Sequence, residues 1–221
     1  SFVSNDYLGL SHHPEVIKAG IDALEQYGAG AGASPLIGGH NFLHEQLEQE
    51  IAHFLKNEYA ITYTSGYAAN CSTLLAMMDK EDIAIMDMFT HASVFDGCLC
   101  TNTKRFLHNN IDSLVHVLNN SKNFKNRFVI IDGVYSQDGD IAFLDQIYAV
   151  CKEHDAFLIV DDAHGIGVLG KTGRGIIEDY GLLDKVDMIT GTFSKAFGCV
   201  GGYAIARKEI ITLLRYYSRQ N

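Results

Sequence analysis

Apolar residues recur at helical spacing in the first quarter of the chain. Val16, Ile17, Ile21 and Leu24 predict one helix, and Pro14 suits its first turn. A second predicted helix has Leu43, Leu47, Ile51, Phe54 and Leu55 on one face. Residues 1–4 have the composition of a short strand. Between the helices, Gly28–Gly39 contains five glycines, and a loop of this length is more often functional than not.

From Tyr59 onward, short apolar runs of strand type alternate with helical patterns. The runs are Tyr59–Tyr63, Ile83–Met86, Lys104–Leu107, Phe128–Ile131, Phe157–Val160, Met188–Thr190 and Tyr203–Ala206. The helical patterns are Ala68–Met77, Ser93–Cys100, Asp112–Leu118, Leu144–His154 and Glu209–Tyr217. This alternation predicts an α/β fold, with a mostly parallel seven-stranded sheet and helices on both faces. We therefore divide the chain into an N-terminal segment, 1–58, with the glycine-rich loop, and a large domain, 59–221.

Polar residues follow the ends of several predicted strands, where parallel sheets bind their ligands. In chain order they are Ser65, Gly66, Tyr67, His91, Ser136, Asp161, His164 and Lys195. Because the carboxyl ends of parallel strands meet at one edge, this placement predicts a single site.

Lys195 lies among glycines and small residues, and no acidic residue stands within six positions of it. An amine held this way can act as a nucleophile toward a carbonyl and form a Schiff base. The alternative is a lysine in a mobile surface loop. Asp161 ends an apolar strand, so its carboxylate needs a cationic partner. Pyridoxal phosphate (PLP) combines an aldehyde, a ring nitrogen and a phosphate that would match these features.

In this interpretation the turn Ser65–Tyr67, which opens a helix, binds the phosphate together with Thr192. His91 stacks on the ring, and His164 and Ser136 reach the ring hydroxyl. Each residue also has a simpler interpretation: Asp161 as a loop cap, His91 as a surface histidine, and Ser136 as a turn residue.

Gly165–Gly170 matches a dinucleotide-binding pattern and, with Lys171 and Thr172, a P-loop. A P-loop requires a helix that opens at this lysine, but Gly173 and Gly175 would break it. We expect a surface turn here, with a P-loop nucleotide-binding protein as a distant alternative.

Composition limits the other classes of function. The formal charge is −10 and no cluster of Lys and Arg is present, which argues against nucleic acid and anionic membranes as partners. No apolar run is long enough for a membrane span. The five cysteines form no C-x-x-C pair, which suits reduced thiols in a cytoplasmic protein. No three His, Cys or carboxylate residues have the sequence spacing that is typical of zinc ligands, so no metal site is expected.

Five motifs resemble those of the α-oxoamine synthases, a family of fold-type I PLP-dependent enzymes. They are Ser65–Asn70, His91–Ser93, Ser136–Asp140, Asp161–Gly165 and Gly191–Lys195. The resemblance implies that Lys195 holds PLP and acts in catalysis with His91. It implies further cofactor contacts from Asp161, His164, Ser136, Thr192, Ser65, Gly66 and Tyr67, and a substrate contact from Asn5.

The family reaction is a decarboxylative condensation of an amino acid with an acyl-CoA. The motifs at Asn5–Pro14 and Ser65–Asn70 look most like members that use alanine and pimeloyl-CoA or its carrier-protein form. Gly201–Tyr203 looks more like glycine-using members, and Ser194 like serine-using members. The resemblance also implies a homodimer with a shared site, and a C-terminal small domain that this chain does not include.

Overall fold

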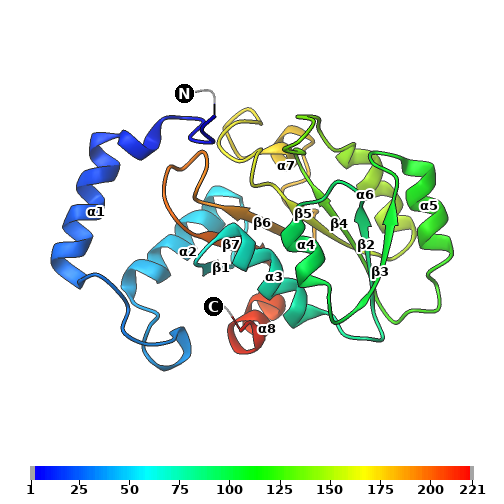
Figure 1. The fold of residues 1–221 in the computed structure, drawn as a ribbon, viewed down its shortest axis with the longest axis horizontal. Coiled ribbons are helices and arrows are strands. Elements are labelled where there is room, and N and C mark those ends of the chain that lie inside the picture. The colour runs from blue at the N-terminus through cyan, green and yellow to red at the C-terminus, as the bar shows by residue number, and fades with distance from the viewer. Residues whose placement is uncertain (1–2, 220–221) are drawn as a thin grey trace.

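A computed structural model describes residues 3–219, which form one seven-stranded mixed sheet between two layers of helices (Figure 1). The strand order is β1-β7-β6-β5-β4-β2-β3. The strands are β1 (Ala60–Tyr63), β2 (Ile83–Asp87), β3 (Asn102–Phe106), β4 (Arg127–Asp132), β5 (Phe157–Asp161), β6 (Met188–Thr192) and β7 (Gly202–Ala206). The predicted α/β fold, with its mostly parallel sheet, is confirmed.

Eight α-helices accompany the strands within the described residues. They are α1 (Pro14–Tyr27), α2 (Phe42–Phe54), α3 (Gly66–Met77), α4 (Ala92–Gly97), α5 (Ile111–Asn119), α6 (Leu144–Glu153), α7 (Ile176–Asp179) and α8 (Lys208–Tyr217). Short 3-10 turns occur at Leu10–His12 and Pro35–Ile37. No described helix has both the length and the apolar character that a membrane crossing requires.

The two faces of the sheet belong to two separate hydrophobic cores, because side chains alternate along each strand. On β2, Ile83 and Ile85 face the core that α2, α5, α6 and α7 cover. Ala84 and Met86 face the other core, which α3, α4 and α8 cover. All strands except the edge strand β3 are largely buried on both faces, and this explains why they appear in the sequence as continuous apolar runs.

Strand β7 differs from the other strands because it runs antiparallel to both of its neighbours, β1 and β6. Its Gly202 lies at the end of the sheet where β1 and β6 finish, opposite Tyr63 and Thr192. The sequence pattern did not show this reversal. It also missed α7, whose four residues are too few for a helical period, and it predicted a strand at residues 1–4. Val3 and Ser4 are not in a strand, and residues 1–2 lie outside the described part.

The N-terminal segment has two parts. Helix α1 has no buried residue and extends away from the sheet (Figure 1). By contrast, α2 contributes Ile51 and Ala52 to the core of the sheet, and Leu55, which caps it, is also part of that core. The division at residue 58 therefore stays a prediction. Within the N-terminal segment, α1 contributes no buried residue to the core, whereas α2 does.

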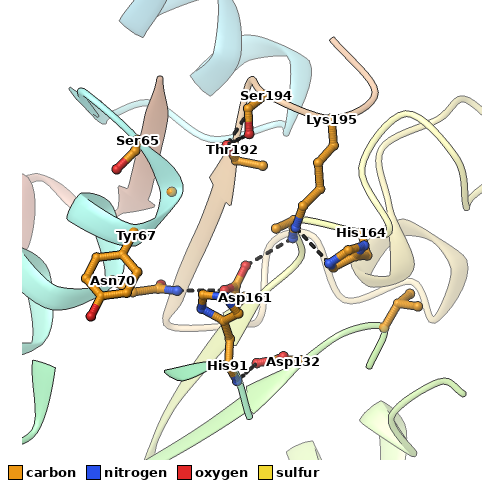
Figure 2. A pocket seen from close by; sticks show the side chains of 13 residues that line it. Ser65, Tyr67, Asn70, His91, Asp132, Asp161, His164, Thr192, Ser194 and Lys195 are labelled. Carbon is orange, nitrogen blue, oxygen red and sulfur yellow. Dashed lines mark hydrogen bonds between the residues drawn. The ribbon is translucent and has the colours of Figure 1, made fainter. Parts of the chain in front are cut away.

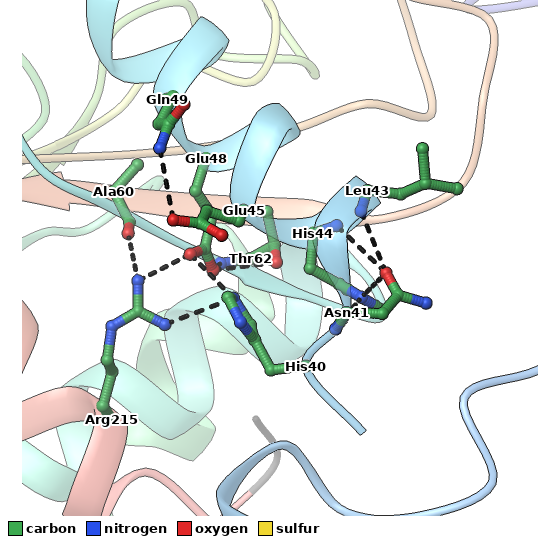
Figure 3. Close-up of polar contacts among 10 residues, drawn as sticks. All are labelled: His40, Asn41, Leu43, His44, Glu45, Glu48, Gln49, Ala60, Thr62 and Arg215. Carbon is green, nitrogen blue, oxygen red and sulfur yellow. Dashed lines mark hydrogen bonds and ion pairs between the residues drawn. The ribbon is translucent and has the colours of Figure 1, made fainter. Parts of the chain in front are cut away.

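A buried ion pair joins α2 to the last helix at the β1 edge of the sheet (Figure 3). Arg215 on α8 donates to the Glu48 carboxylate at 2.5 Å and to the Ala60 carbonyl at 3.2 Å. The other Glu48 oxygen accepts from the backbone N–H and the hydroxyl of Thr62 on β1. His40 lies 3.0 Å from the same carboxylate. These contacts fix β1, and β1 leads directly into the first site motif.

Candidate active site

One cavity at the carboxyl ends of β1, β4, β5 and β6 collects most of the predicted site residues (Figure 2). Its volume is about 240 Å³. Its lining includes Ser65, Gly66, Tyr67, His91, Asp161, His164, Thr192 and Lys195, all predicted from the sequence. Asn70, Asp132, Val134, Ala163 and Ser194 also line it. Residues from distant parts of the chain thus converge where a parallel sheet binds ligands.

The Lys195 amine projects into this cavity from the loop after β6 and makes a hydrogen bond with His164. Its Nζ lies 2.7 Å from His164 Nε2, and His164 Nδ1 lies 2.7 Å from the Tyr7 hydroxyl. Burial lowers the pKa of Lys195, although the charges of Asp161 and Asp132 oppose this effect. Burial, and then the Lys195 charge, lower the pKa of His164 to about 4. A neutral imidazole therefore lies beside an amine that gives up its proton more readily than an ordinary lysine.

Asp161 ends β5 at the floor of the cavity, where two N–H groups hold its carboxylate. Asn70 on α3 donates to Oδ2 at 2.6 Å, and the Ala163 backbone donates to Oδ1 at 3.0 Å. Asn70 also donates to Ser93 at 2.9 Å, so its amide is fixed from two sides. A carboxylate held in this way is suited to face a positively charged ring nitrogen.

Asp132 is a second buried carboxyl of the cavity, and the sequence interpretation gave it no role. It ends β4 directly beside Asp161, because the two residues are register partners in adjacent strands. Burial, and then the charge of Asp161, raise the pKa of Asp132 well above its usual value. It accepts one long hydrogen bond, 3.4 Å, from the backbone of His91. The signal that could have found it is its position at a strand end, the same as that of Asp161.

The N-terminus of α3 meets β6 and β7 closely and forms a narrow corner of the cavity. Ser65 caps the helix by accepting from the Ala68 N–H at 3.0 Å, so the first N–H groups of the helix face the cavity. A Cβ on Gly202 would lie 2.3 Å from the Ser65 carbonyl oxygen, and one on Gly66 would lie 2.9 Å from Thr192 Cβ. Glycine is therefore required at both positions, and the corner offers the N–H groups and dipole that anions prefer.

His91 lies at the mouth of the cavity as the cap of α4. Its Nδ1 lies 2.7 Å from the Ser93 hydroxyl, and its ring meets Tyr67 edge-on at 6.2 Å between centroids. The Tyr67 hydroxyl in turn donates to Asp96. These contacts fix the plane of the imidazole against the opening.

Two predicted residues do not line the cavity in this structure. Ser136 is exposed in the turn after β4, and Asn5 is exposed in the N-terminal segment. Asn5 Oδ1 lies 3.4 Å from the hydroxyl of Tyr7, which itself reaches His164. Their roles toward cofactor and substrate stay predictions. Tyr7 was missed as a contact, although it lies in the same motif as Asn5.

The glycine pattern at Gly165–Gly170 is a surface turn, as predicted, and not a P-loop. Lys171 and Thr172 are in a turn, and the next helix begins only at Ile176. Thr172 donates to Glu178 at 2.5 Å. Asp162, the neighbour of Asp161, points away from the cavity, because its carboxyl fills the space beside Gly133, Gly165 and Gly175. Within residues 3–219, no group of three or more His, Cys, Asp and Glu side chains is arranged to hold a metal ion.

The residues of this cavity fit PLP in all three of its polar parts. An amine with a lowered pKa faces the centre, a doubly held carboxylate lies at the floor, and a helix N-terminus forms the opposite corner. At this corner, neighbouring atoms approach Gly66 and Gly202 so closely that a Cβ at either position would not fit.

Known proteins with similar sequences and structures are PLP enzymes of one group. An 8-amino-7-oxononanoate synthase from Bacillus subtilis is 43% identical over 98% of this chain and 56% of the relative. One from Thermoanaerobacter pseudethanolicus is 41% identical over 98% and 55%. A serine palmitoyltransferase from S. paucimobilis, solved with bound PLP, superposes with a TM-score of 0.95 at 35% identity, over 98% of this chain and 55% of that one.

The chain thus spans about half the length of the curated relatives that it matches. The resemblance to the α-oxoamine synthases is confirmed, since the relatives and the solved structures belong to that group. The profile of aminotransferase class I and II matches residues 1–221, and the chain therefore belongs to the aminotransferase class I and II family.

Proposed function

We propose that this chain carries the PLP site of an 8-amino-7-oxononanoate synthase, which condenses alanine with pimeloyl-CoA or its carrier-protein form and releases carbon dioxide. The observation that carries the proposal is the convergence of Lys195, Asp161 and the α3 N-terminus on one cavity. The relatives at 41% to 43% identity that bear this name support the choice of substrates.

PLP, when bound, supplies an electron-withdrawing ring that stabilises negative charge at the α-carbon of the amino acid. Lys195 would hold the aldehyde carbon and, once released, move the α-proton, and its lowered pKa suits both tasks. Asp161 would hold the proton of the ring nitrogen. His164 would contact the ring hydroxyl together with Ser136, and His91 would cover one face of the ring. Ser65, Gly66, Tyr67 and Thr192 would bind the phosphate.

Reconstitution with PLP tests the cofactor assignment. We expect a visible absorbance band that borohydride fixes covalently to Lys195, located by peptide mapping. A protein that stays colourless with PLP and instead hydrolyses ATP would support the P-loop alternative. A protein that keeps its only measurable function after Lys195→Ala would be a binding module and not this enzyme.

Serine palmitoyltransferase is the second candidate function. The solved serine palmitoyltransferase superposes with a TM-score of 0.95, against 0.82 at 29% identity for an 8-amino-7-oxononanoate synthase from Francisella tularensis. A screen of alanine, glycine and serine against pimeloyl-CoA, acetyl-CoA and palmitoyl-CoA, with the full-length protein, separates the candidates. Preference for glycine with acetyl-CoA would indicate 2-amino-3-ketobutyrate CoA ligase.

The working form that we propose is a cytoplasmic homodimer in which the two subunits share each site. Support comes from the glycine-rich loop, in which Gly30 and Gly32 have no atom within 4 Å of an added Cβ in their own chain. A cavity of about 520 Å³ lies between this loop and the ends of β1 and β7, with Ser34, Tyr63 and Phe193 in its lining. The competing interpretation is a mobile lid over the chain's own site.

Subunit complementation distinguishes a shared site from a lid. One full-length chain carries Lys195→Ala, and the other carries Gly30→Val with Gly32→Val. Recovery of activity in the mixture requires that each site uses both chains. If heterodimers form and no activity returns, the loop serves its own chain.

A further inference from the structure

A histidine outside the cavity joins two segments that the fold brings together beside it. His108 lies in the loop between β3 and α5. Its Nδ1 is 2.9 Å from Asp87 at the end of β2, and its Nε2 is 2.7 Å from Asp140. Asp140 belongs to segment 133–142, which follows β4, reaches the cavity through Val134 and carries the exposed Ser136.

The two contacts indicate which protons the His108 ring holds. An ionised carboxylate only accepts hydrogen bonds, so with Asp87 and Asp140 both ionised each ring nitrogen donates and the ring is an imidazolium. Asp87 also accepts from the backbone N–H groups of Phe89 and Asn109, each at 2.9 Å, and Asp140 accepts from the Asn109 amide at 2.9 Å. Burial lowers the pKa of His108, but its hydrogen bonds and charge interactions with Asp87 and Asp140 outweigh this and raise the pKa above its usual value.

Aromatic side chains hold the same ring from two sides. Phe89 stacks on it at 4.4 Å between centroids, and Tyr135 meets it edge-on at 4.4 Å. The charged groups that face the ring are Asp87 from β2 and Asp140 from segment 133–142, and the phenol of Tyr135 is the other titratable group. The geometry leaves the ring little freedom to turn away from either carboxylate.

Segment 133–142 is a loop closed on itself by backbone hydrogen bonds. Tyr135 donates to the Asp140 carbonyl at 3.0 Å, and Ala142 donates to the Gly133 carbonyl at 3.1 Å. Its outer end is attached to the β3–α5 loop through Asp140 and through the Ile141 carbonyl, which accepts from Asn109 at 3.0 Å. Both His108, through its ring, and Asn109, through its backbone N–H, also reach the sheet at Asp87.

We propose that His108 is a positioning residue which, as an imidazolium between Asp87 and Asp140, holds segment 133–142 against the sheet and thereby places Val134 at the cavity, in the same segment as the exposed Ser136. Asp87, Asp140, Phe89 and Tyr135 contact its ring, and they lie outside the described cavity lining, so His108 acts through the segment. The structural part of the proposal concerns this chain alone. Its consequence for cofactor binding rests on the proposed function.

The protonation state is tested first on the unaltered full-length protein. In ¹⁵N NMR across a pH series, the ring nitrogens of His108 are expected to keep the signals of an imidazolium to a higher pH than an ordinary histidine does. A His108 ring that becomes neutral at or below the pH of an ordinary histidine overturns the proposal, and this measurement needs no variant that could fail to fold.

Hydrogen exchange tests the attachment without any cofactor. In His108→Gln, the amides of Gly139 and Ala142 are expected to exchange at least tenfold faster than in the parent protein. The matched control, His116→Gln on the exposed side of α5, is expected to leave them unchanged. In the parent, exchange corrected for its intrinsic pH dependence should accelerate as the pH rises through the raised pKa of His108. Equal exchange in both variants would contradict the attachment.

PLP affinity tests the consequence for the site. His108→Gln is expected to raise the dissociation constant for PLP at least fivefold and to remove part of its pH dependence, and Asp140→Asn should give a similar change. The double variant should bind PLP no more weakly than the weaker-binding single variant, because both substitutions break the same contact between His108 and Asp140. Faster exchange with unchanged PLP affinity would overturn the positioning role alone, whereas failure of the parent to bind PLP would overturn the proposed function.

Discussion

At the scale of single residues, the chemistry of the site depends on how much of its charge is buried. Lys195 has a lowered pKa because of burial, so a larger fraction of its amine is neutral and nucleophilic at a given pH. We expect reductive methylation of Lys195 in the cofactor-free protein to reach half its maximal rate at a lower pH than that of Lys171, an exposed lysine. Peptide mapping across a pH series measures both. The same pH dependence for the two lysines would contradict the assignment.

Asn70 gives a second prediction at this scale. Its amide donates to the buried Asp161 carboxylate at 2.6 Å, and hydrogen bonds to charged groups contribute about 1.5–3 kcal/mol. Asn70→Ala is therefore expected to weaken PLP binding roughly ten- to a hundredfold. Asn126→Ala is the control, since Asn126 makes a similar bond to Asp82 at 2.7 Å, away from the cavity. An equal loss of PLP affinity in both variants would mean that only stability had changed.

The sequence identified residues whose place in the fold follows from a single strand. It missed roles that depend on a contact between two elements. Lys195, Asp161 and His164 each stand just after an apolar run, so their place at the sheet edge could be predicted. Asn70 matters because of its hydrogen bond to Asp161, which lies far along the chain. Asp132 has a predictable place at a strand end, but its raised pKa comes in part from Asp161 on the adjacent strand. Neither periodicity nor composition records such a cross-strand pairing.

At the scale of elements, the corner between α3 and β7 depends on a glycine in the strand. An added Cβ at Gly202 would meet the Ser65 carbonyl oxygen at 2.3 Å and the Gly66 nitrogen at 2.6 Å, and both are backbone atoms. Gly202→Ala is therefore expected to lower the free energy of unfolding by about 1–3 kcal/mol, as overpacking does, and to weaken phosphate binding. Thermal unfolding and competition between PLP and inorganic phosphate measure the two effects.

Gly20→Ala provides a control that is expected to change the free energy of unfolding in the opposite direction. Gly20 lies within α1, and an added Cβ there meets no atom within 4 Å. Alanine in a helix interior should stabilise α1 by about 0.5–1 kcal/mol relative to glycine. If both substitutions destabilise the protein equally, the close approach at Gly202 is not the cause.

The elements themselves were largely predictable, because all strands except β3 are largely buried on both faces and most of the longer helices have one apolar face. The orientation of β7 was not, because an antiparallel strand in the interior of a sheet has the same apolar composition as a parallel one. That orientation brings Gly202 to Ser65, so the shape of the phosphate corner also had to come from the structure.

At the scale of the whole molecule, α1 carries an apolar face that residues 3–219 leave exposed. Ile17, Ile21 and Leu24 are 48%, 51% and 56% exposed and share one side of the helix. If this face contacts the partner in the proposed homodimer, Ile21→Lys with Leu24→Lys should raise the dimer dissociation constant at least about tenfold, since each buried aliphatic side chain contributes roughly 1.5–3 kcal/mol. Analytical ultracentrifugation of the full-length protein measures this constant.

Ala19→Lys with Gln26→Lys serves as the control, because it adds the same charge to the opposite side of α1. This pair is expected to leave the dimer intact. Equal dissociation in both double variants would show that net charge, rather than the apolar face, controls assembly.

The strand order also has a consequence for synthesis on the ribosome. Of the strands in the described residues, β1 is made first, but its partner in the sheet is β7, which is made last of the seven. At typical translation rates the nascent chain waits on the order of ten seconds between the two. During that time β2 to β5 can pair, whereas β1 has no strand to join. The corner that closes on Gly66 and Gly202 therefore forms only after β7 has been made, and the proposed phosphate site stays incomplete until then.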